Sequence, residues 1–461
     1  MRFKILSLIK DTLLFALGSI GSKLILFLLV PLYTNFLTEA EYGISELVFS
    51  TSQLLIPFLS LVIFDAVIRF GLSKEEKSED VLLIGLLVFA AGSVLTVVIT
   101  PLFGLYDALA EWKWYMCVYI IFNMLCAILG CYIKAVNKNK LYTAVNILQT
   151  LVMALLNVLL LVVRSTGVRG YLLSTILASV VAAAVFFLFG GVIKDLKKAR
   201  FRPELLKKMV IYSAPLILNN VSWWAIHSSD KIMIEWVIGS AALGIYTVAT
   251  KIPALINVII SIFSQAWNIS SAKEMEGDDD AEFYSKVFVV YQSLTFAAVI
   301  VLNGVMKPFM GIYVGEAFSS AWRYVPILLT AAGFSAISSY FGSMYGAMKR
   351  SVNNMATTLT AAVVNIVLNF FFIRLWGVWG AAIATLVAYI LLATMRTIDV
   401  KRYVSIKIPA GRYVFNAGLI LAQTIFVALD WHIYAVSLLV LALYAEVNVP
   451  VLLKTVRLSA R

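Results

Sequence analysis

Long apolar runs, separated by short polar or Gly- and Pro-containing segments, recur along almost the whole chain. A helix that crosses a bilayer needs about 20 mostly apolar residues, and the runs have this length. They predict fourteen transmembrane helices, near residues 12–37, 44–68, 81–106, 112–133, 141–163, 171–193, 210–238, 242–270, 286–306, 322–346, 354–373, 378–396, 413–429 and 433–453. The first run is longer than a signal-peptide core and lacks a clear cleavage site, so we expect it to be retained.

Composition agrees with an all-α polytopic membrane protein. Of the 461 residues, 62% are hydrophobic and 13% are charged, whereas about 25% charged residues is usual in soluble domains. A soluble enzyme is therefore excluded. The three cysteines, Cys117, Cys126 and Cys131, lie in one apolar stretch without disulfide or metal-ligand spacing.

The basic residues are distributed unevenly between the two sides of the membrane. If the N-terminus is cytoplasmic, 28 Lys and Arg residues lie on that side and 6 on the other. Because cationic loops are retained in the cytoplasm during insertion, we expect both termini to be cytoplasmic. This topology accounts for most of the net charge of +12, so contact with anionic lipid is sufficient and nucleic acid is not expected.

The helices fall into two groups of six and a final pair. We expect an N-terminal bundle at 1–193, a basic cytoplasmic linker at 194–209, a second bundle at 210–400 and two additional helices with a basic tail at 401–461. Offsets of 201 to 212 residues align short motifs of the two bundles. The aligned motifs are Tyr42-Gly43-Ile44 with Leu243-Gly244-Ile245, Ala135 with Ala347, Asn157 with Asn369, and Gly167–Gly170 with Gly377–Gly380. They predict a pseudo-symmetric repeat whose interface would hold a transported substrate.

Several ionisable residues fall inside predicted spans, where each is a candidate functional site because its insertion is costly. Lys23, Lys231 and Lys251 are expected to face a central cavity. Asp230 lies next to Lys231, and Asp65 lies four residues before Arg69, a spacing that allows a pair on one helix face. These carboxylates could couple transport to H⁺ or Na⁺, or they could form internal ion pairs with the lysines.

A polar and aromatic stripe follows one face of the seventh predicted helix. Its members, at helical spacing, are Asn220, Trp223, Trp224, His227 and Lys231. The stripe suits a sugar or a headgroup, and interhelical hydrogen bonding is the alternative. Gln265 is expected on the same face of the eighth helix as Lys251.

Prolines interrupt four predicted helices and mark candidate hinges. They are Pro31, Pro57, Pro215 and Pro253. A proline removes one backbone hydrogen bond and so permits a kink. Bending at these positions would open and close a cleft.

Catalytic and metal-binding motifs are missing from the sequence. It has no GxxxxGK[ST] nucleotide loop and no HExxH motif, and its two histidines are His227 and His432. We therefore expect neither an enzyme nor a bound metal or other cofactor.

Several ordered motifs resemble the bacterial polysaccharide transporters, the oligosaccharide-lipid flippases of the multidrug/oligosaccharidyl-lipid/polysaccharide (MOP) superfamily. They are Gly18-Ser-Ile-Gly-Ser-Lys23, Pro31 to Thr38, Glu41-Tyr-Gly-Ile44, Ser229-Asp-Lys-Ile232, Gly244 to Lys251, Gly346-Ala-Met-Lys349 and Asn365 to Gly380. The resemblance implies two bundles around a cationic cavity that alternates between inward- and outward-open states in the bacterial cytoplasmic membrane. It also implies a monomer that works with a polysaccharide polymerase and chain-length machinery.

The resemblance further implies a substrate and its binding residues. The substrate would be an undecaprenyl-diphosphate-linked oligosaccharide, moved outward for cell-surface polysaccharide synthesis. Lys23 and Lys251 match helices whose basic residues serve the diphosphate in the related lipid II flippases, although arginine is typical there. Lysine still supplies a point charge for phosphate, but the difference disfavours lipid II itself.

Other functions remain open from the sequence. A multidrug and toxin extrusion (MATE) antiporter shares the 6+6 plan and would use Asp65 or Asp230 for proton or sodium coupling. The extra helix pair and the deep lysines disfavour it. A non-transporting scaffold or an enzyme of envelope-glycan assembly would belong to a different class.

Overall fold

The computed structural model describes residues 21, 23–73, 75–254, 256, 260, 263, 280–348, 350–404 and 406–459. In these ranges the chain forms helices and turns and no strand, which confirms the predicted all-α class. The chain divides into two compact units, Met1–Trp224 and Ala225–Arg461. The boundary falls inside one long helix, α11.

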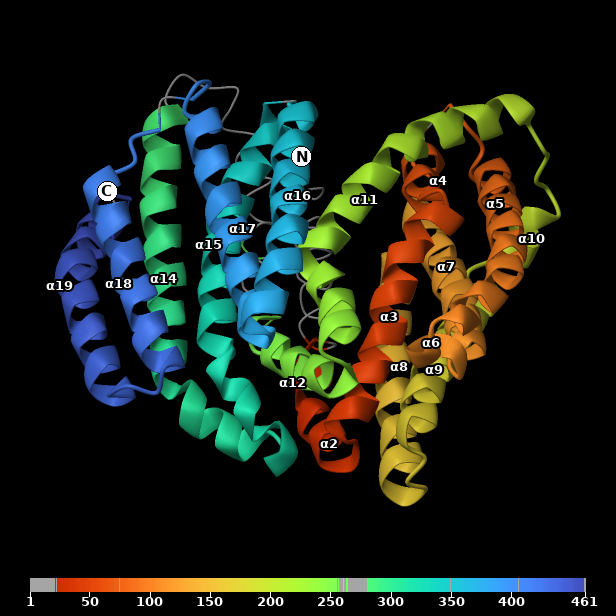
Figure 1. The fold of residues 1–461 in the computed structure, drawn as a ribbon. Coiled ribbons are helices and arrows are strands. Elements are labelled where there is room, and N and C mark those ends of the chain that lie inside the picture. The colour runs from red at the N-terminus through yellow and green to blue at the C-terminus, as the bar shows by residue number, and fades with distance from the viewer. Residues whose placement is uncertain are drawn as a thin grey trace. The chain divides into compact units, whose positions relative to one another are not determined.

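The first unit contains the helices up to the boundary in α11 (Figure 1). They are α2 (Val30–Phe36), α3 (Glu39–Leu59), α4 (Ile63–Gly71), α5 (Ser78–Ile99), α6 (Asp107–Ala110), α7 (Lys113–Ala135), α8 (Asn139–Asn157), α9 (Gly167–Phe189), α10 (Val192–Leu196) and the first part of α11 (Pro203–Val237). A 3₁₀ segment, Thr100–Leu105, continues α5, and a π-helical segment, Val158–Val163, continues α8.

The second unit contains the end of α11 and the helices that follow. They are α12 (Ser240–Lys251), α14 (Asp280–Tyr313), the 3₁₀ segment Glu316–Arg323, α15 (Val325–Ala347), α16 (Ser351–Trp376), α17 (Val378–Val400), α18 (Ala410–Ala428) and α19 (Ile433–Ser459). Helix α17 packs along both α15 and α16, while α18 and α19 pack against α14. The final helix pair is thus part of the second unit.

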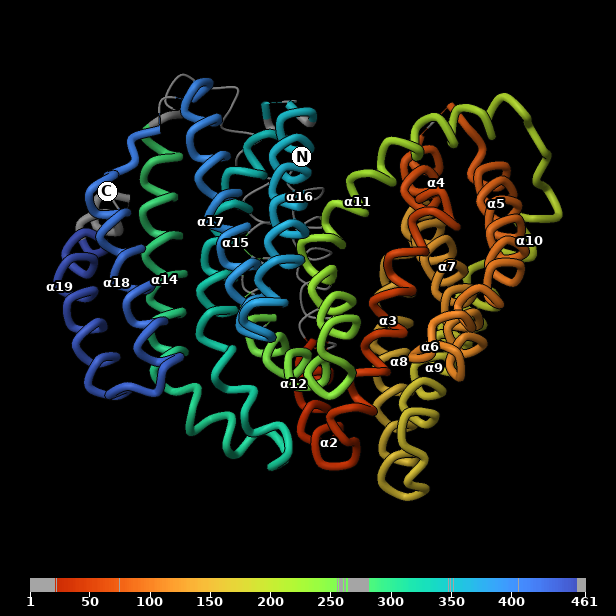
Figure 2. The backbone as a smooth tube through the Cα atoms, viewed as in Figure 1, coloured from red at the N-terminus to blue at the C-terminus, as the bar shows by residue number. Residues whose placement is uncertain are grey.

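The predicted second helix, 44–68, is not a single straight span. It consists of α3 and α4, which are bent by 55° relative to each other (Figure 2). Leu61 and Val62 adopt left-handed backbone angles, each with φ of 51°, which no helix can contain. The Ser60 hydroxyl stabilises the break, since it donates to the Ile56 carbonyl and accepts from the Val62 amide. The break follows Pro57 by three residues.

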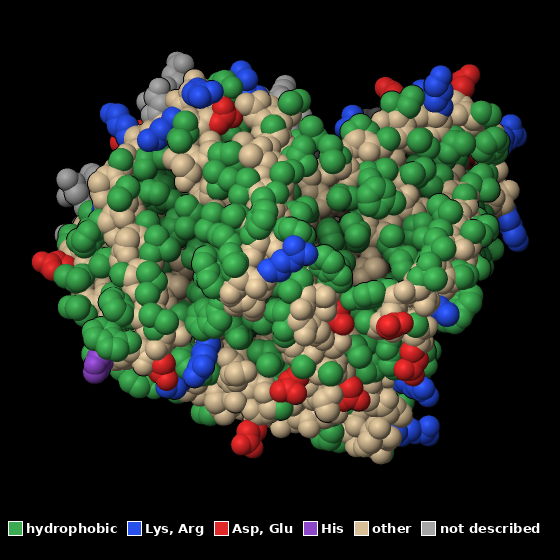
Figure 3. Space-filling model, viewed as in Figure 1, with side chains coloured by type: hydrophobic (Ala, Val, Ile, Leu, Met, Phe, Trp, Pro, Cys, Tyr) green, Lys and Arg blue, Asp and Glu red, His purple; other side chains and the backbone are tan. Residues whose placement is uncertain are grey.

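Eleven helices in the described ranges are long and apolar enough to cross a membrane, or twelve if α3 and α4 form one bent span. On the face shown in Figure 3, hydrophobic side chains predominate. The predicted helices 12–37 and 242–270 lie partly outside the described residues. The total of fourteen and the cytoplasmic location of both termini therefore remain predictions.

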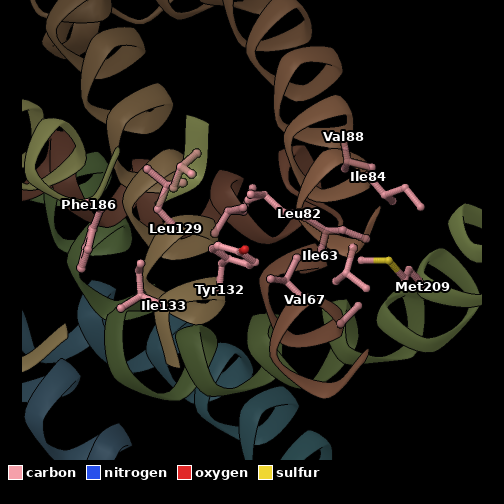
Figure 4. Close-up of a cluster of buried hydrophobic side chains, with 14 of the residues drawn as sticks. Ile63, Val67, Leu82, Ile84, Val88, Leu129, Tyr132, Ile133, Phe186 and Met209 are labelled. Carbon is pink, nitrogen blue, oxygen red and sulfur yellow. The ribbon is translucent and has the colours of Figure 1, made fainter. Parts of the chain in front are cut away.

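A cluster of buried hydrophobic side chains joins α4, α5, α7, α9 and α11 in the first unit (Figure 4). Val67 from α4, Leu82 from α5 and Tyr132 from α7 are completely buried in it. At the other end of α5, Gly92 permits close approach to α3, because a Cβ there would lie 2.1 Å from the Leu59 carbonyl oxygen. These contacts hold the bent helix pair against its neighbours.

Buried amides join the helices of the C-terminal pair. Asn416 on α18 and Asn448 on α19 exchange hydrogen bonds of 3.0 and 2.9 Å through their side-chain amides. Gln423 donates to the Ile300 carbonyl on α14 and to the Ser437 hydroxyl on α19. Such bonds link helices within a membrane, where the hydrophobic effect gives little drive for association.

The region expected as a basic linker, 194–209, is held to the first unit by acidic side chains. Asp80 accepts from the Arg200 backbone amide at 2.8 Å. Glu76 pairs with Arg202 at 2.6 Å and with Lys208 at 3.1 Å. Helix α11 begins immediately afterwards at Pro203, and a proline is well suited to a first helical position.

We expect the Glu76 pairs to make stability depend on pH. Burial alone would raise the pKa of Glu76, but hydrogen bonds from Lys208 and Arg202 outweigh it and hold that pKa below its ordinary value of 4.5. A carboxyl with a lowered folded-state pKa contributes stability above its unfolded pKa, and this contribution is lost as pH falls through the folded pKa. In detergent at pH 7, wild type should therefore unfold at a higher temperature than Glu76→Gln. This difference in unfolding temperature should vanish in acid.

The exposed neighbour Glu75 provides the matched control. Glu75→Gln should unfold like wild type across the same pH range. A difference between wild type and Glu76→Gln that stayed constant down to pH 3 would contradict the assigned role of these ion pairs.

Candidate functional site

A small polar cavity lies inside the second unit, among α11, α12, α15 and α17. Its volume is about 90 Å³. The polar side chains that line it are His227, Asp230, Tyr246, Thr250, Ser335, Thr385 and Tyr389. A water molecule occupies about 30 Å³ in the liquid, and pockets for small organic ligands usually measure about 300–1,000 Å³. In this conformation the cavity therefore suits water or a small ion, not a saccharide.

Asp230 supplies the carboxylate of this cavity and is only 3% exposed. The Tyr246 hydroxyl donates to Oδ2, and the Thr385 hydroxyl approaches the same oxygen at 3.4 Å. The other oxygen, Oδ1, accepts from the Lys231 backbone amide at 2.8 Å. A buried carboxylate is costly unless hydrogen bonds satisfy it, and these donors come from three helices. The site can therefore stabilise the charged carboxylate of Asp230, and neutralising that charge would change these hydrogen bonds.

His227 lies on the same face of α11, one turn before Asp230 and Lys231. The Tyr389 hydroxyl is 3.0 Å from Nδ1 of His227, and the tautomer of the ring decides which group donates. The imidazole, the carboxyl and two tyrosine hydroxyls thus surround one cavity. This arrangement can bind and release a proton, or it can offer oxygen ligands to a small cation.

The structure divides the predicted polar and aromatic stripe of α11. Asn220, Trp223 and Trp224 belong to the first unit, whereas His227 and Lys231 belong to the second. The Trp224 indole donates to the Ser50 carbonyl at 2.9 Å, and the Asn220 amide donates to the Leu216 carbonyl of its own helix. Trp224 thus makes the interhelical bond that was the alternative to sugar binding.

The three predicted diphosphate-binding lysines are half-buried. Lys23 belongs to the first unit and begins the helical stretch Lys23–Phe36. Lys251 ends α12, and Lys231 is one helical turn from His227 on α11. Their convergence on one substrate remains a prediction. Gln265 lies outside the described residues.

Asp65 and Arg69 do not form the expected pair on α4. The Arg69 guanidinium lies over the Tyr212 ring of α11, 4.7 Å from its centroid. No ion pair between Asp65 and Arg69 occurs in the described part of the chain. The packing of α4 against α11 therefore determines the partner of Arg69, and spacing along the helix does not.

The prolines occupy different local settings. Pro31 stands at the start of α2, Pro57 precedes the bend between α3 and α4, and Pro215 lies within α11. Pro253 lines the cavity beside Asp230. Movement at these positions remains a prediction.

The predicted repeat also appears in the local structure of the two units. Gly167, the first residue of α9, and Gly377, immediately before α17, have nearly identical positive φ values of 58° and 59°. Asn157 on α8 and Asn369 on α16 are each fully buried. In each, the side-chain oxygen Oδ1 lacks a hydrogen-bond partner within the described chain. The two halves of the repeat therefore share a backbone conformation and a buried polar side chain at matching positions.

Sequence reasoning missed Tyr246, Thr385 and Tyr389, although Tyr246 stands inside the motif Gly244 to Lys251. It also missed Arg396, which is 1% exposed on α17. A tyrosine or threonine in an apolar helix gives little signal by itself. The charge of Arg396 inside the span 378–396 was the one feature that could have been noticed.

Comparisons with known proteins identify the family. The profile of the polysaccharide biosynthesis protein family matches residues 8–268. No curated protein matches the chain in a sequence comparison. In the described residues, no group of three His, Cys, Asp or Glu side chains is placed to hold a metal ion.

Solved structures of similar fold are membrane transporters. The lipid II flippase MurJ, in an inward closed conformation, has a TM-score of 0.66 and 15% identity, covering 94% of this chain and 98% of its own. An inward-facing MATE transporter of the MOP superfamily also has a TM-score of 0.66, at 13% identity, covering 83% of this chain and 98% of its own. A MOP superfamily transporter from Pyrococcus furiosus has a TM-score of 0.62 at 14% identity, covering 86% and 95%. The chain therefore belongs to the polysaccharide biosynthesis protein family, as a multi-pass bacterial membrane protein with the fold of flippases and transporters.

Proposed function

We propose that the protein is a flippase that moves an undecaprenyl-diphosphate-linked oligosaccharide outward across the bacterial cytoplasmic membrane. Membership of the polysaccharide biosynthesis protein family is the observation that carries this proposal. The transporter fold supports it, because lipid-linked sugars are assembled on one face of a membrane and used on the other. On this proposal the protein works as a monomer beside a polysaccharide polymerase and chain-length machinery.

The charge of the substrate favours this direction of transport. A sugar linked through a diphosphate carries about two negative charges, and an inside-negative potential assists outward movement by about 2.3 kcal/mol per charge per 100 mV. The remaining barrier is dehydration of the diphosphate. Lys23, Lys231 and Lys251 are proposed to lower this barrier as cationic partners within the membrane.

Asp230 is proposed as the coupling site for H⁺ or Na⁺. Its carboxylate is buried, accepts hydrogen bonds from separate helices and lines a cavity that suits water or a small ion. Loading or unloading this carboxylate would change its bonds to Tyr246 on α12 and Thr385 on α17. Coupling therefore requires no sugar to enter the cavity.

We expect the lysines to determine whether the substrate is retained. A Lys23→Ala, Lys251→Ala double variant should lose a polyprenyl-diphosphate oligosaccharide that copurifies with wild type, because the diphosphate loses two cationic partners. Mass spectrometry of lipids from the gently purified proteins would measure this loss. Alanine replacements at the exposed linker residues Lys197 and Lys198 provide a control of equal charge change.

Three outcomes of this experiment would redirect the proposal. If the Lys23→Ala, Lys251→Ala variant retained the lipid-linked oligosaccharide as well as the linker control does, Lys23 and Lys251 would not be needed for substrate binding. Recovery of bulk phospholipid only, even from wild type, would favour the MATE-type antiporter, which the buried Asp230 carboxylate also suits. Proton- or sodium-coupled efflux would then be assayed. Recovery of lipid II would favour the lipid II flippase despite lysine in place of arginine.

A further inference from the structure

We infer that an anionic glycerophospholipid binds in a groove between α16 and α17, at the end of the second unit where α16 begins and α17 finishes. The groove has a volume of about 470 Å³. That volume is within the range of sites for small organic ligands, about 300–1,000 Å³, and exceeds that of the Asp230 cavity fivefold. The inference concerns a different site and does not depend on the proposed substrate.

The walls of the groove are apolar and exposed. Val352 and Ile398 are 70% and 56% exposed, and Ala356 and Met395 complete the walls. These residues lie in the candidate membrane spans Val352–Trp376 and Val378–Val400, within about two turns of their ends. At 1.5 Å per residue, two turns correspond to about 11 Å, so the groove extends from the membrane interface into the hydrocarbon region. An acyl chain fits these walls.

The rim of the groove is cationic. Arg402 lines it with a side chain that is 71% exposed, and Lys401 beside it is also exposed. The Arg350 guanidinium lies 3.8 Å from the centroid of the Tyr403 ring, at the start of α16. Basic side chains at the membrane interface attract acidic lipid headgroups. The rim thus complements a phosphate that lies above an acyl chain.

One carboxylate, Asp399, also lines the groove, but it already accepts hydrogen bonds from protein side chains. The Tyr345 hydroxyl and the Asn353 amide donate to its Oδ2 at 2.8 and 2.9 Å, and Arg402 lies 3.9 Å from its Oδ1. Asp399 therefore orders the rim and offsets one of its positive charges.

A buried arginine adds positive charge behind the wall. Arg396 donates to the Ser338 carbonyl and to the side-chain oxygens of Asn354 and Thr358. It also donates to Thr357, which lines the groove, at 3.3 Å. All four acceptors are neutral, so its charge is not cancelled by them. Arg350, Arg396, Lys401 and Arg402 against Asp399 give a net charge of +3 around the groove.

Native mass spectrometry of the full-length, delipidated protein would test the inference with phosphatidylglycerol and phosphatidylcholine as probes. Removing one basic contact costs about fivefold in affinity for an acidic lipid. Wild type should bind phosphatidylglycerol about fivefold better than phosphatidylcholine, and Arg402→Gln should lose this preference. Ala356→Trp, which fills the groove, should weaken binding of both lipids. Arg323→Gln, at an exposed arginine far along the chain, should retain the wild-type preference.

Three results would overturn the inference. Equal binding of the two lipids by wild type would make the groove an apolar surface without headgroup recognition. An unchanged preference in Arg402→Gln would place the lipid elsewhere. Displacement of phosphatidylglycerol by inorganic phosphate would indicate an anion site that needs no acyl chain. Because Arg402 is exposed and Ala356 lies on an exposed face, the two variants test charge and shape independently of folding.

Discussion

Asp230→Asn is expected to reduce gradient-driven transport by at least tenfold while leaving the fold intact. Asparagine has nearly the same shape and can still accept from Tyr246 and Thr385, but it cannot gain or lose a proton or supply a full negative charge. Hydrogen bonds to charged groups contribute about 1.5–3 kcal/mol, and about 1.4 kcal/mol corresponds to a factor of ten. Translocation of a fluorescent lipid-linked oligosaccharide in proteoliposomes, under an imposed pH or Na⁺ gradient, would measure the effect.

A second aspartate provides the control for this experiment. Asp430 is half-exposed and pairs with Lys307 at 2.6 Å, where solvent screens the interaction. Asp430→Asn should transport at close to the wild-type rate. If Asp230→Asn kept both its rate and its dependence on the gradient, the carboxylate would have a structural role and coupling would reside elsewhere.

Gly380→Ala is expected to destabilise the second unit more than other alanine replacements of glycine in the same unit. A Cβ at this position would lie 2.0 Å from the Phe372 carbonyl oxygen and 2.7 Å from the Ile373 backbone nitrogen. Backbone atoms cannot rotate away as a side chain can, so α16 and α17 would have to separate. Overpacking usually costs about 1–3 kcal/mol, and we expect this backbone overlap to reach at least the upper value. The midpoint of thermal aggregation in detergent would measure the loss.

Two other glycines provide controls for this comparison. Gly418 on α18 has open space where a Cβ would stand, with nothing within 4 Å, so Gly418→Ala should be neutral or slightly stabilising. Gly170 is the counterpart of Gly380 in the repeat, but its closest contact is the Thr166 hydroxyl at 2.1 Å, a side chain that can rotate. Gly170→Ala should therefore be milder. Equal losses for Gly380→Ala and Gly418→Ala would contradict the close packing of α16 and α17.

The membrane character, the all-α class and the position of most helices could be predicted from the sequence alone. These features follow from local properties: a run of apolar residues is long enough to span a bilayer or it is not, whatever lies beside it. The repeat was also visible, because Gly167 and Gly377 are needed at one backbone position with positive φ in each unit. The motifs that resemble those of the bacterial polysaccharide transporters also identified the family, and the family profile over residues 8–268 confirms it.

Which polar side chains meet depends on how the helices pack. Periodicity places Asp65 and Arg69 on one face, yet the Arg69 guanidinium lies over the Tyr212 ring of α11, because α4 packs against that helix. Helical spacing likewise gave no indication that the Trp224 indole bonds to Ser50.

The Asp230 cavity and the groove beside Arg402 also required the packed structure. The cavity is built from helices that are distant along the chain, and the groove from the far ends of the consecutive helices α16 and α17. Helix packing determines both the partners of a buried charge and the space left between helices. A sequence gives the residues of each helix and its faces. The contacts between faces exist only once the helices are packed, and in this protein those contacts create both candidate binding sites.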